Sequence, residues 1–246
     1  MKVIVVLLLG FAAVTYARRL PSYIPICKQS DPDYSGCIKK AMTAVQPYLA
    51  KGIKELNIPA LEPLVVPMVK LEQGTGAVNY RANLKDIKIY GLTKFSVDQL
   101  MVDFIGAKAF LARIDLPEIT LLSDYEISGN VLVLPIQGNG EMSANLTNCK
   151  ADIMLMVEPM QKKGKEYMHV KEVKTKLHFG EARANFDNLF NGNSVLGMTT
   201  NNFLNENAKD ILNEIKPAIE AVTNMLGEDI INKIFKSAPA NELFPQ

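Results

Sequence analysis

The carboxy-terminal fifth of the chain carries an apolar repeat that is too long for an ordinary surface helix. Between residues 203 and 235 apolar side chains recur at spacings of three and four, interrupted only by Pro217 and Gly227. The repeat consists of Phe203, Leu204, Ala208, Ile211, Leu212, Ile215, Ala218, Ile219, Val222, Leu226, Ile230, Ile234 and Phe235. A helix of thirty residues is about 45 Å long. Without a heptad pattern of charges, such a helix needs a long apolar surface elsewhere in the same chain.

A segment of period two precedes this helix and can supply that surface. From about residue 74 to 179 apolar and polar residues alternate, as at Val78, Tyr80, Ala82 and Leu84. Residues 128–130, 138–140 and 162–165 carry turn signals, so we expect long antiparallel strands joined by hairpins. Strands longer than the usual five or six residues favour a wide, curved sheet. The sequence therefore predicts an α+β fold in which the sheet wraps the carboxy-terminal helix.

The amino-terminal part has a different pattern. Apolar residues from Ile38 to Leu56 follow a helical period, and Pro47 should kink that helix or start its second half. Pro59, Pro63 and Pro67 then forbid a helix interior. We expect residues 58–67 to form an extended connector at a sheet edge.

The first residues indicate the compartment. Lys2 is followed by an apolar run from Val3 to Tyr16, and Ala17 ends a segment with the pattern of a cleavage site. An uncleaved anchor is the alternative, but the run is shorter than the roughly 20 residues of a membrane span. We predict a signal peptide at residues 1–17 and a secreted, extracellular single domain at residues 18–246.

The cysteines agree with an oxidising compartment. Cys27 and Cys37 flank the turn-rich residues 31–36, so we expect them to form a disulfide. Cys149 is then left over, either as a buried inert thiol, which we favour, or as a reactive thiol or dimer link. Asn145-Leu146-Thr147 is a glycosylation sequon that a secreted chain can use.

The charge balance argues against a nucleic-acid or anionic-lipid partner. The chain has 27 basic and 26 acidic residues, and loss of Lys2 makes the two numbers equal. A chain without net charge has no general electrostatic attraction to polyanions. We expect a monomer that binds no nucleic acid and does not insert stably into membranes.

Several segments resemble the takeout and juvenile-hormone-binding protein family. They cover essentially the whole mature chain in the family's order. They are the Cys27–Cys37 pair, Gly52-Ile53-Lys54-Glu55-Leu56, the prolines at 59, 63 and 67, Tyr125-Glu126-Ile127-Ser128-Gly129, residues 134–140, residues 185–193 and Phe203-Leu204-Asn205-Glu206-Asn207.

The resemblance implies an insect secreted protein of TULIP-like fold, in which a curved sheet wraps a long helix and leaves an apolar tunnel. It also implies isoprenoid or fatty ligands. Haemolymph juvenile-hormone carriers of the family use a second disulfide, for which this chain offers only Cys149. The chain therefore resembles the takeout branch more closely.

Motifs of enzymes are weak or missing. The sequence has no Gly-x-Ser-x-Gly, no phosphate-binding loop and no His-Glu-x-x-His, and Gly74-Thr75-Gly76 lacks the third glycine of a dinucleotide loop. His169 and His178 are nine residues apart, on opposite faces of a continuous strand. We predict no enzyme activity, no cofactor and no metal site.

The ligand-binding candidates are apolar and aromatic residues of the sheet and the helix. Eleven Met and ten Phe occur without Trp, and methionine fills irregular apolar walls. A single helix cannot fill a wide sheet, so part of the apolar wall should face a cavity. The candidates are Tyr80, Tyr90, Tyr125, Val133, Met154, Met156, Tyr167, Phe186, Phe190, Phe203, Ile211, Ile215, Ile219 and Val222.

The sequence thus favours a secreted carrier that encloses an isoprenoid or fatty ligand. One alternative is a lipid-directed hydrolase, for which Ser128 and Ser143 are the serines to test. The other is a lipid-transfer module that docks on membranes through an exposed apolar tip.

Overall fold

The computed structural model describes residues 21–73, 78–104, 106 and 108–246. The predicted signal peptide and Gly74-Thr75-Gly76 therefore lie outside the described residues. The elements in chain order are α1 (Tyr34–Leu49), η1 (Lys54–Leu56), β1 (Leu64–Gln73), β2 (Val78–Tyr90), η2 (Leu92–Lys94), β3 (Ser96–Asp103), β4 (Ala109–Val131), β5 (Leu134–Lys162), β6 (Lys165–His178), β7 (Glu181–Phe186), η3 (Phe190–Gly192), α2 (Ser194–Glu206), α3 (Ala208–Phe235) and α4 (Ala240–Leu243).

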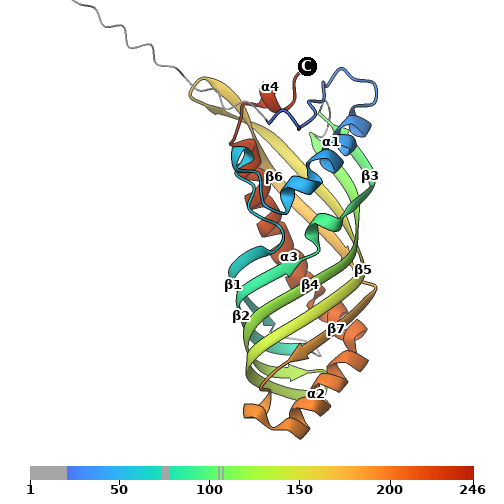
Figure 1. Cartoon of the computed structure of the whole chain (residues 1–246), viewed down its shortest axis with the longest axis vertical. Helices are drawn as coiled ribbons and strands as arrows, with labels where there is room; N and C mark the ends of the chain where they lie inside the picture. The colour runs from blue at the N-terminus through green and yellow to red at the C-terminus, as the bar shows by residue number, and fades with distance from the viewer. Residues whose placement is uncertain (1–20, 74–77, 105, 107) are drawn as a thin grey trace, which may run out of the picture.

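Two very long strands organise the sheet. β4 has 23 residues and β5 has 29, and the two pair with each other along almost their whole length. At the α2 end of the molecule, β1 and β2 extend the sheet beside β4, and β7 pairs with β5. At the other end β3 pairs with β4, and β6 pairs with β5. All these pairs are antiparallel. The sheet is curved, and the long strands run diagonally across it (Figure 1).

The long strands change which side chains face the helices partway along their length. Ile136 packs in one cluster with Leu204 of α2, and Leu155 packs in another with Phe235 of α3. Ile136 and Leu155 differ by an odd number of positions in the sequence, so an uninterrupted strand would put them on opposite faces. Between them Asn148 has a positive φ of 52° and lies opposite Pro117. This pair accounts for the change, because proline donates no hydrogen bond and a left-handed residue interrupts the alternation.

The strands β1 and β2, at the edge of the sheet, show the same pairing of a proline with a left-handed residue. Pro67 of β1 lies opposite Asp86 of β2, whose φ is 50°. Val66 and Val69, on the two sides of this pair, are both buried although they are three positions apart. β1 is the edge strand predicted from the proline series, and it begins at Leu64 within the expected connector.

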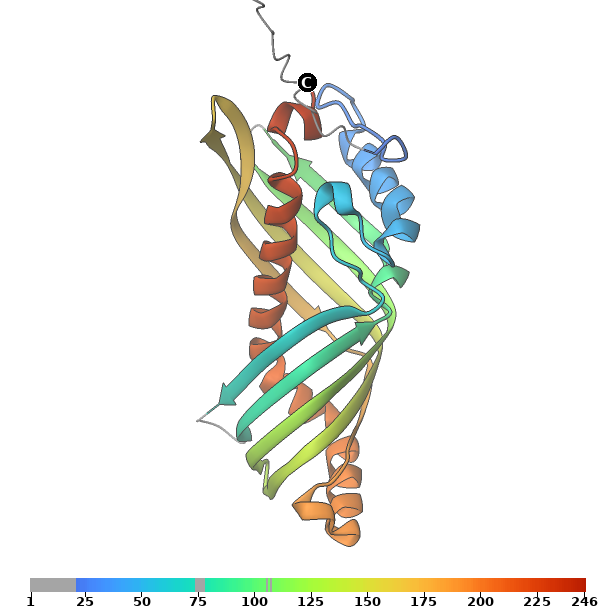
Figure 2. The ribbon, with the colours of Figure 1, turned by 60° about the vertical axis from the view of Figure 1, so that its left-hand side comes forward.

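α3 lies along the concave face of the sheet (Figure 2). Two of its side chains fix it to β6: Asn232 Oδ1 accepts a hydrogen bond from the Val170 N–H at 3.0 Å, and Glu220 Oε1 accepts one from the Leu177 N–H at 2.8 Å. The structure therefore confirms the predicted combination of a curved antiparallel sheet and a long carboxy-terminal helix. No helix among the described residues is long and apolar enough to cross a bilayer.

The predicted single helix from 203 to 235 is two helices. α2 ends at Glu206, and Asn207 takes a non-helical φ of −105° before α3 begins. The Asn207 side chain donates to the Phe203 carbonyl at 2.8 Å, which satisfies one of the carbonyls that a helix end leaves free. Pro217 and Gly227, which interrupt the apolar repeat, both lie inside α3.

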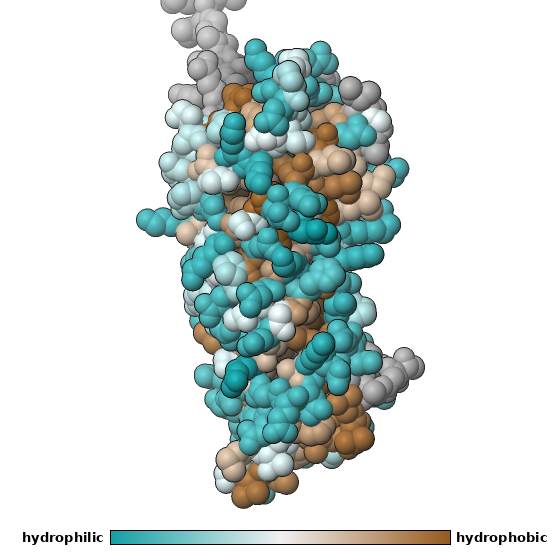
Figure 3. Space-filling view, turned by 90° about the vertical axis from the view of Figure 1, so that its right-hand side faces the viewer, coloured by the Kyte–Doolittle hydropathy of each residue, from teal (hydrophilic) through white to brown (hydrophobic). Residues whose placement is uncertain are grey.

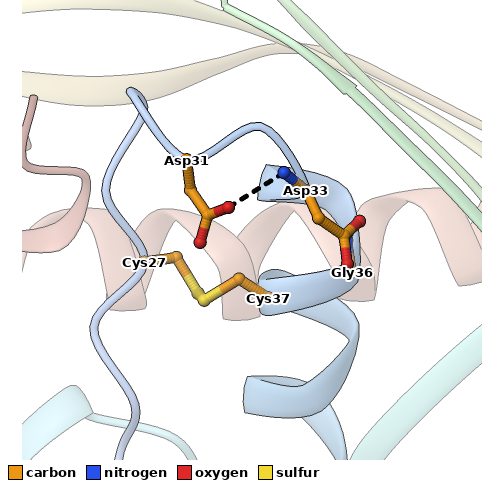
Figure 4. Close-up of a disulfide and its surroundings, with 5 residues drawn as sticks. All are labelled: Cys27, Asp31, Asp33, Gly36 and Cys37. Carbon is orange, nitrogen blue, oxygen red and sulfur yellow. Dashed lines mark hydrogen bonds between the residues drawn. A yellow bond between two sulfur atoms is a disulfide. The ribbon is translucent and has the colours of Figure 1, made fainter.

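The disulfide between Cys27 and Cys37 is present, as the sequence predicts. Figure 4 shows how the intervening turn brings the sulfurs together: Asp31 Oδ1 accepts a hydrogen bond from the Asp33 N–H at 2.9 Å. Asp33 in turn caps α1 by accepting from the Gly36 N–H at 3.1 Å. α1 is shorter than predicted, ending at Leu49 soon after Pro47, and Leu56 belongs to a separate 3₁₀ turn.

Two predicted turns are wrong, because residues 128–130 lie inside β4 and residues 138–140 lie inside β5. Gly138-Asn139-Gly140 lies inside β5, and β4 and β5 are instead joined at Leu132 and Val133. The glycines serve close packing: a Cβ at Gly138 would lie 3.0 Å from the Leu189 Cα, and one at Gly140 would lie 2.8 Å from the Asp187 carbonyl oxygen.

Candidate functional site

The concave face of the sheet holds two separate groups of buried side chains. The lower cluster, near α2, comprises Tyr80, Ala82, Tyr125, Val131, Ile136, Leu189 and Leu204. The upper cluster, near α4, comprises Leu155, Val157, Met168, Val170 and Phe235. β1 and β2 add a third group beside α3, made of Leu64, Val66, Val69 and Ile87. The well-packed parts of the interior are therefore at the two ends and along one side.

The middle of α3 lies between these groups and is less covered. All residues of α3 are described, and only Asn232 and Phe235, both in its last turn, are buried. Ile211 and Ile215 pack against the lower cluster and Val222 against the third group, but each is only partly buried. Ile219 is on the same helical stripe, four residues after Ile215 and three before Val222. An apolar stripe that faces a sheet without full burial leaves apolar surface available for a ligand.

Two buried hydroxyl groups on the sheet have no hydrogen-bond partner among the described residues. Tyr80 is only 5% exposed, and its hydroxyl oxygen is one of them. Burial raises the pKa of the Tyr80 phenol, so the group stays neutral. The hydroxyl of Ser123, on β4, is the other. A buried hydroxyl without a partner costs free energy, so each atom is a position where a polar ligand group would be stabilised.

Tyr125 differs from Tyr80 although both belong to the lower cluster. Its hydroxyl donates to the Asp187 carbonyl oxygen at 2.5 Å, which ties β4 to the segment after β7. Burial, with the Asp187 carboxylate adding to it, raises the pKa of Tyr125 to about 12. Its ring meets the Phe186 ring edge to face at 5.1 Å. Tyr125 therefore has a hydrogen-bond partner, whereas none of the described residues is a partner of the Tyr80 hydroxyl.

Six of the fourteen ligand-binding candidates gather at the lower cluster. Tyr80 and Tyr125 are members, and four others pack against it: Phe186, Phe190, Ile211 and Ile215. Val222 lies farther along α3, against the group on β1 and β2. Tyr90 ends β2, Phe203 lies in α2 and Ile219 in α3, and all three are partly buried.

Four candidates do not face the interior. Val133 is 88% exposed in the turn between β4 and β5. Met154 and Met156 alternate with Leu155, which faces the upper cluster, and Tyr167 precedes Met168 of that cluster. These three side chains therefore lie on the opposite face of the sheet. The structure therefore does not bring Met154 and Met156 into the interior, where the sequence-based prediction placed them.

Met154 instead lines a groove of about 810 Å³ on the outer face, between α1 and the sheet. Its other walls include Met101 and Leu111, with Arg113 and Asp152 at the rim. Arg113 Nε lies 2.6 Å from Asp152 Oδ1, and this hydrogen bond lowers the pKa of the Asp152 carboxyl.

Cys149 is buried, as favoured from the sequence. Burial raises the pKa of its thiol to about 11, so the reactive thiolate is scarce at neutral pH. Among the described residues, no three His, Cys, Asp or Glu side chains are grouped as metal ligands would be. Ser128 and Ser143 are exposed, and neither forms a hydrogen bond with a histidine in the part of the chain described.

Sequence reasoning missed Ser123 and the buried group of β1 and β2 formed by Leu64, Val66, Val69 and Ile87. Alternation assigns a residue to one face only if its strand is uninterrupted. β2 changes at Asp86 and β4 changes at Pro117, so counting along these strands does not place Leu84 and Ser123 correctly. The prolines themselves, each within a strand-like run, were the available signal.

Comparison with known proteins gives a consistent picture. A model of the family described as haemolymph juvenile hormone binding protein matches residues 4–245. A Drosophila melanogaster protein named circadian clock-controlled protein daywake is 24% identical over 238 residues, which are 94% of this chain and 90% of that protein. A Schistocerca gregaria protein named "Putative beta-carotene-binding protein" is 20% identical over 219 residues, which are 88% of this chain and 86% of that protein.

A solved structure has the same fold. The crystal structure of Epiphyas postvittana Takeout 1 matches with a TM-score of 0.75 and 24% sequence identity, covering 91% of this chain and 100% of that one. At this level of identity the likeness concerns the fold alone, and it agrees with the curved sheet and long helix described above.

Proposed function

The chain belongs to the haemolymph juvenile hormone binding protein family, and from that premise we propose that it is a secreted carrier of a small hydrophobic ligand. The ligand occupies the space between the middle of α3 and the concave face of the sheet. The observation that carries this proposal is the apolar stripe of α3, which faces the sheet and yet has no buried residue before Asn232 in a helix described throughout. Such a stripe is unfavourable in water unless something covers it.

The ligand is mainly apolar, with one polar group. The Tyr80 hydroxyl is buried without a partner at one end of the interior, where a ligand hydroxyl, carbonyl or carboxyl can bind it. Enclosing an apolar chain is worth roughly 0.8 kcal/mol for each CH₂ group. A ligand of about fifteen carbons gains on the order of 10 kcal/mol, less several kcal/mol for ordering, which corresponds to micromolar binding.

Secretion is part of the proposal. The signal-peptide pattern at residues 1–17 supports it, as does the Cys27–Cys37 disulfide, which persists in oxidising compartments. Asn145 is the proposed glycosylation site. Its side chain lies partly exposed on β5, and its amide nitrogen donates to Glu118 Oε1 at 2.7 Å, a bond that has to give way to a glycan.

Native mass spectrometry of the protein secreted by insect cells tests the proposal. We expect one lipid for each chain, released on denaturation and identifiable after solvent extraction. A chain that carries no lipid, and that after purification binds no fluorescent fatty-acid probe at micromolar concentration, contradicts a carrier.

A further inference from the structure

Two uncharged stretches of the chain meet at one end of the molecule. Residues 127–140 and 188–205 contain no Asp, Glu, Lys, Arg or His, and they are the two longest uncharged stretches after residue 19. The first stretch covers the end of β4, its turn and the start of β5, and the second covers η3 and most of α2. Both lie at the lower end of the molecule, beside each other in Figures 1 and 2.

The same end exposes apolar side chains. We define the apolar tip as Val133, Val195, Leu196 and Met198, which are 88%, 67%, 48% and 63% exposed. Figure 3 shows hydrophobic residues reaching the surface at this end. Directly behind the tip, Leu132 and Phe190 pack against the lower cluster, so the tip is connected to the proposed ligand space.

The chemistry of the tip suits a lipid surface better than a protein partner. Four side chains of this size expose a few hundred Å² in all, less than the roughly 800 Å² that each partner buries in a stable protein interface. A protein interface also usually has a polar rim with complementary charges, and both stretches lack charges. Bringing uncharged Asn, Ser and Thr side chains to lipid headgroups requires no desolvation of ions, and the apolar side chains can enter the acyl boundary.

We propose that the apolar tip docks reversibly on a neutral lipid surface, from which the carrier takes up or to which it delivers its ligand. The purpose of this docking rests on the proposed carrier function, but the docking itself does not. The contact is shallow, because only side chains of the β4–β5 turn and the first turns of α2 reach the surface. It is also independent of lipid charge, because the tip has none.

Flotation with vesicles of phosphatidylcholine tests the docking. The test variant carries Val195→Glu and Met198→Glu, two exposed positions in the first turns of α2, where a carboxylate suits the helix dipole. The control variant carries Met101→Glu and Met225→Glu, which are 62% and 58% exposed and lie away from the tip. We expect the wild type and the control to float alike, and the tip variant to partition about tenfold less.

Four results overturn the docking proposal. The first is a wild type that stays at the bottom of the gradient with neutral vesicles. The second is equal loss of binding in both variants. The third is binding that requires anionic vesicles and disappears as salt is raised from about 0.1 to about 0.5 M, since that dependence identifies an electrostatic contact. A doubled mass in light scattering that only the tip variant loses also overturns it, because the tip is then an interface between copies.

Bound lipid, measured by native mass spectrometry on the same samples, separates this proposal from the carrier function. If the wild type holds lipid but does not float, the docking proposal is wrong and the carrier function stands. If the wild type floats but holds no lipid, the carrier function is wrong and the docking proposal stands. We expect the tip variant to keep its lipid, because neither changed side chain faces the interior.

Discussion

Asn205 binds the backbone of Ala184 through both ends of its amide: Oδ1 accepts from the Ala184 N–H at 2.8 Å, and Nδ2 donates to the Ala184 carbonyl at 2.9 Å. Asn201 binds Phe186 in the same way, at 2.9 and 3.0 Å. Four residues of helix rise about 6 Å and two residues of strand about 6.6 Å, so the two spacings match. α2 thus occupies the place of a further strand beside β7.

Replacing Asn205 with alanine should lower the free energy of unfolding by about 1–3 kcal/mol, because it leaves the partly buried Ala184 amide without its partner. Urea denaturation followed by circular dichroism measures the change. Asn202→Ala is the matched control, since Asn202 is exposed on the same helix and should alter stability by less than about 0.5 kcal/mol. Equal effects of the two substitutions would contradict this role of Asn205.

Removing the hydroxyl from Tyr80 and from Tyr125 should have opposite effects. Tyr125→Phe breaks the bond to Asp187 and should lower the stability of lipid-free protein by about 1 kcal/mol. Tyr80→Phe removes a buried hydroxyl without a partner, so stability should stay the same or rise by up to about 1 kcal/mol. Urea titrations of lipid-free protein compare the two variants. A marked loss of stability in Tyr80→Phe would show that the Tyr80 hydroxyl has a partner in the folded protein.

The same Tyr80→Phe variant should bind a fluorescent fatty acid about three- to tenfold more weakly, because one ligand hydrogen bond is lost. Its affinity for a hydrocarbon probe without a polar group should not change. An equal decrease for both probes would mean that Tyr80 shapes the interior rather than binding a polar group.

Ile219→Trp should fill the proposed space beside α3 and reduce probe binding by at least about tenfold, while the protein stays folded. The matched control is Met225→Trp, because Met225 is 58% exposed on the same helix. Fluorescence titration and a thermal melt measure the two effects. An unfolded Ile219→Trp variant indicates a filled interior, and unchanged binding indicates a ligand elsewhere; either result contradicts the proposed location.

Cys149 should resist alkylation in the native protein. Its pKa of about 11 leaves almost no thiolate at pH 8, so iodoacetamide should label it only after unfolding in urea. In the native state the labelling rate should rise as the pH approaches 11. Intact mass spectrometry measures the label. Cys149→Ser is the control, which should take up no label as long as no reductant opens the Cys27–Cys37 disulfide. Rapid labelling at pH 8 would show that the thiol is accessible.

Much of the fold could be predicted from local patterns, since the period of two, the helical stripe and the Cys27–Cys37 turn are each encoded in short segments. The break at Asn207 could not, because apolar periodicity continues through it and only the bond to the Phe203 carbonyl marks it. The turn at Leu132 and Val133 was missed because Gly138 and Gly140 look like turn residues, whereas long-range packing against Leu189 and Asp187 requires them.

The candidate site was predictable where its residues follow the helix. Ile211, Ile215 and Val222 could be assigned from spacing, and the structure places them toward buried clusters. Met154 and Met156 were misplaced because the side of a strand depends on counting from a fixed point, and the strand changes phase within its length. That phase depends on how Pro117 and Asn148 face each other, which no single strand reveals.

The paired Pro117 and Asn148 have a consequence for folding. Long hairpins with simple alternation are prone to slip by whole steps, and a slip of two residues would keep every side chain on its face. Here such a slip would separate Pro117 from the left-handed Asn148 and set it against a residue whose hydrogen bond it cannot complete. The two halves of the β4–β5 hairpin would also disagree about which face is apolar. The pairing of Pro117 with Asn148 thus favours the observed register of the β4–β5 hairpin over registers shifted by two residues.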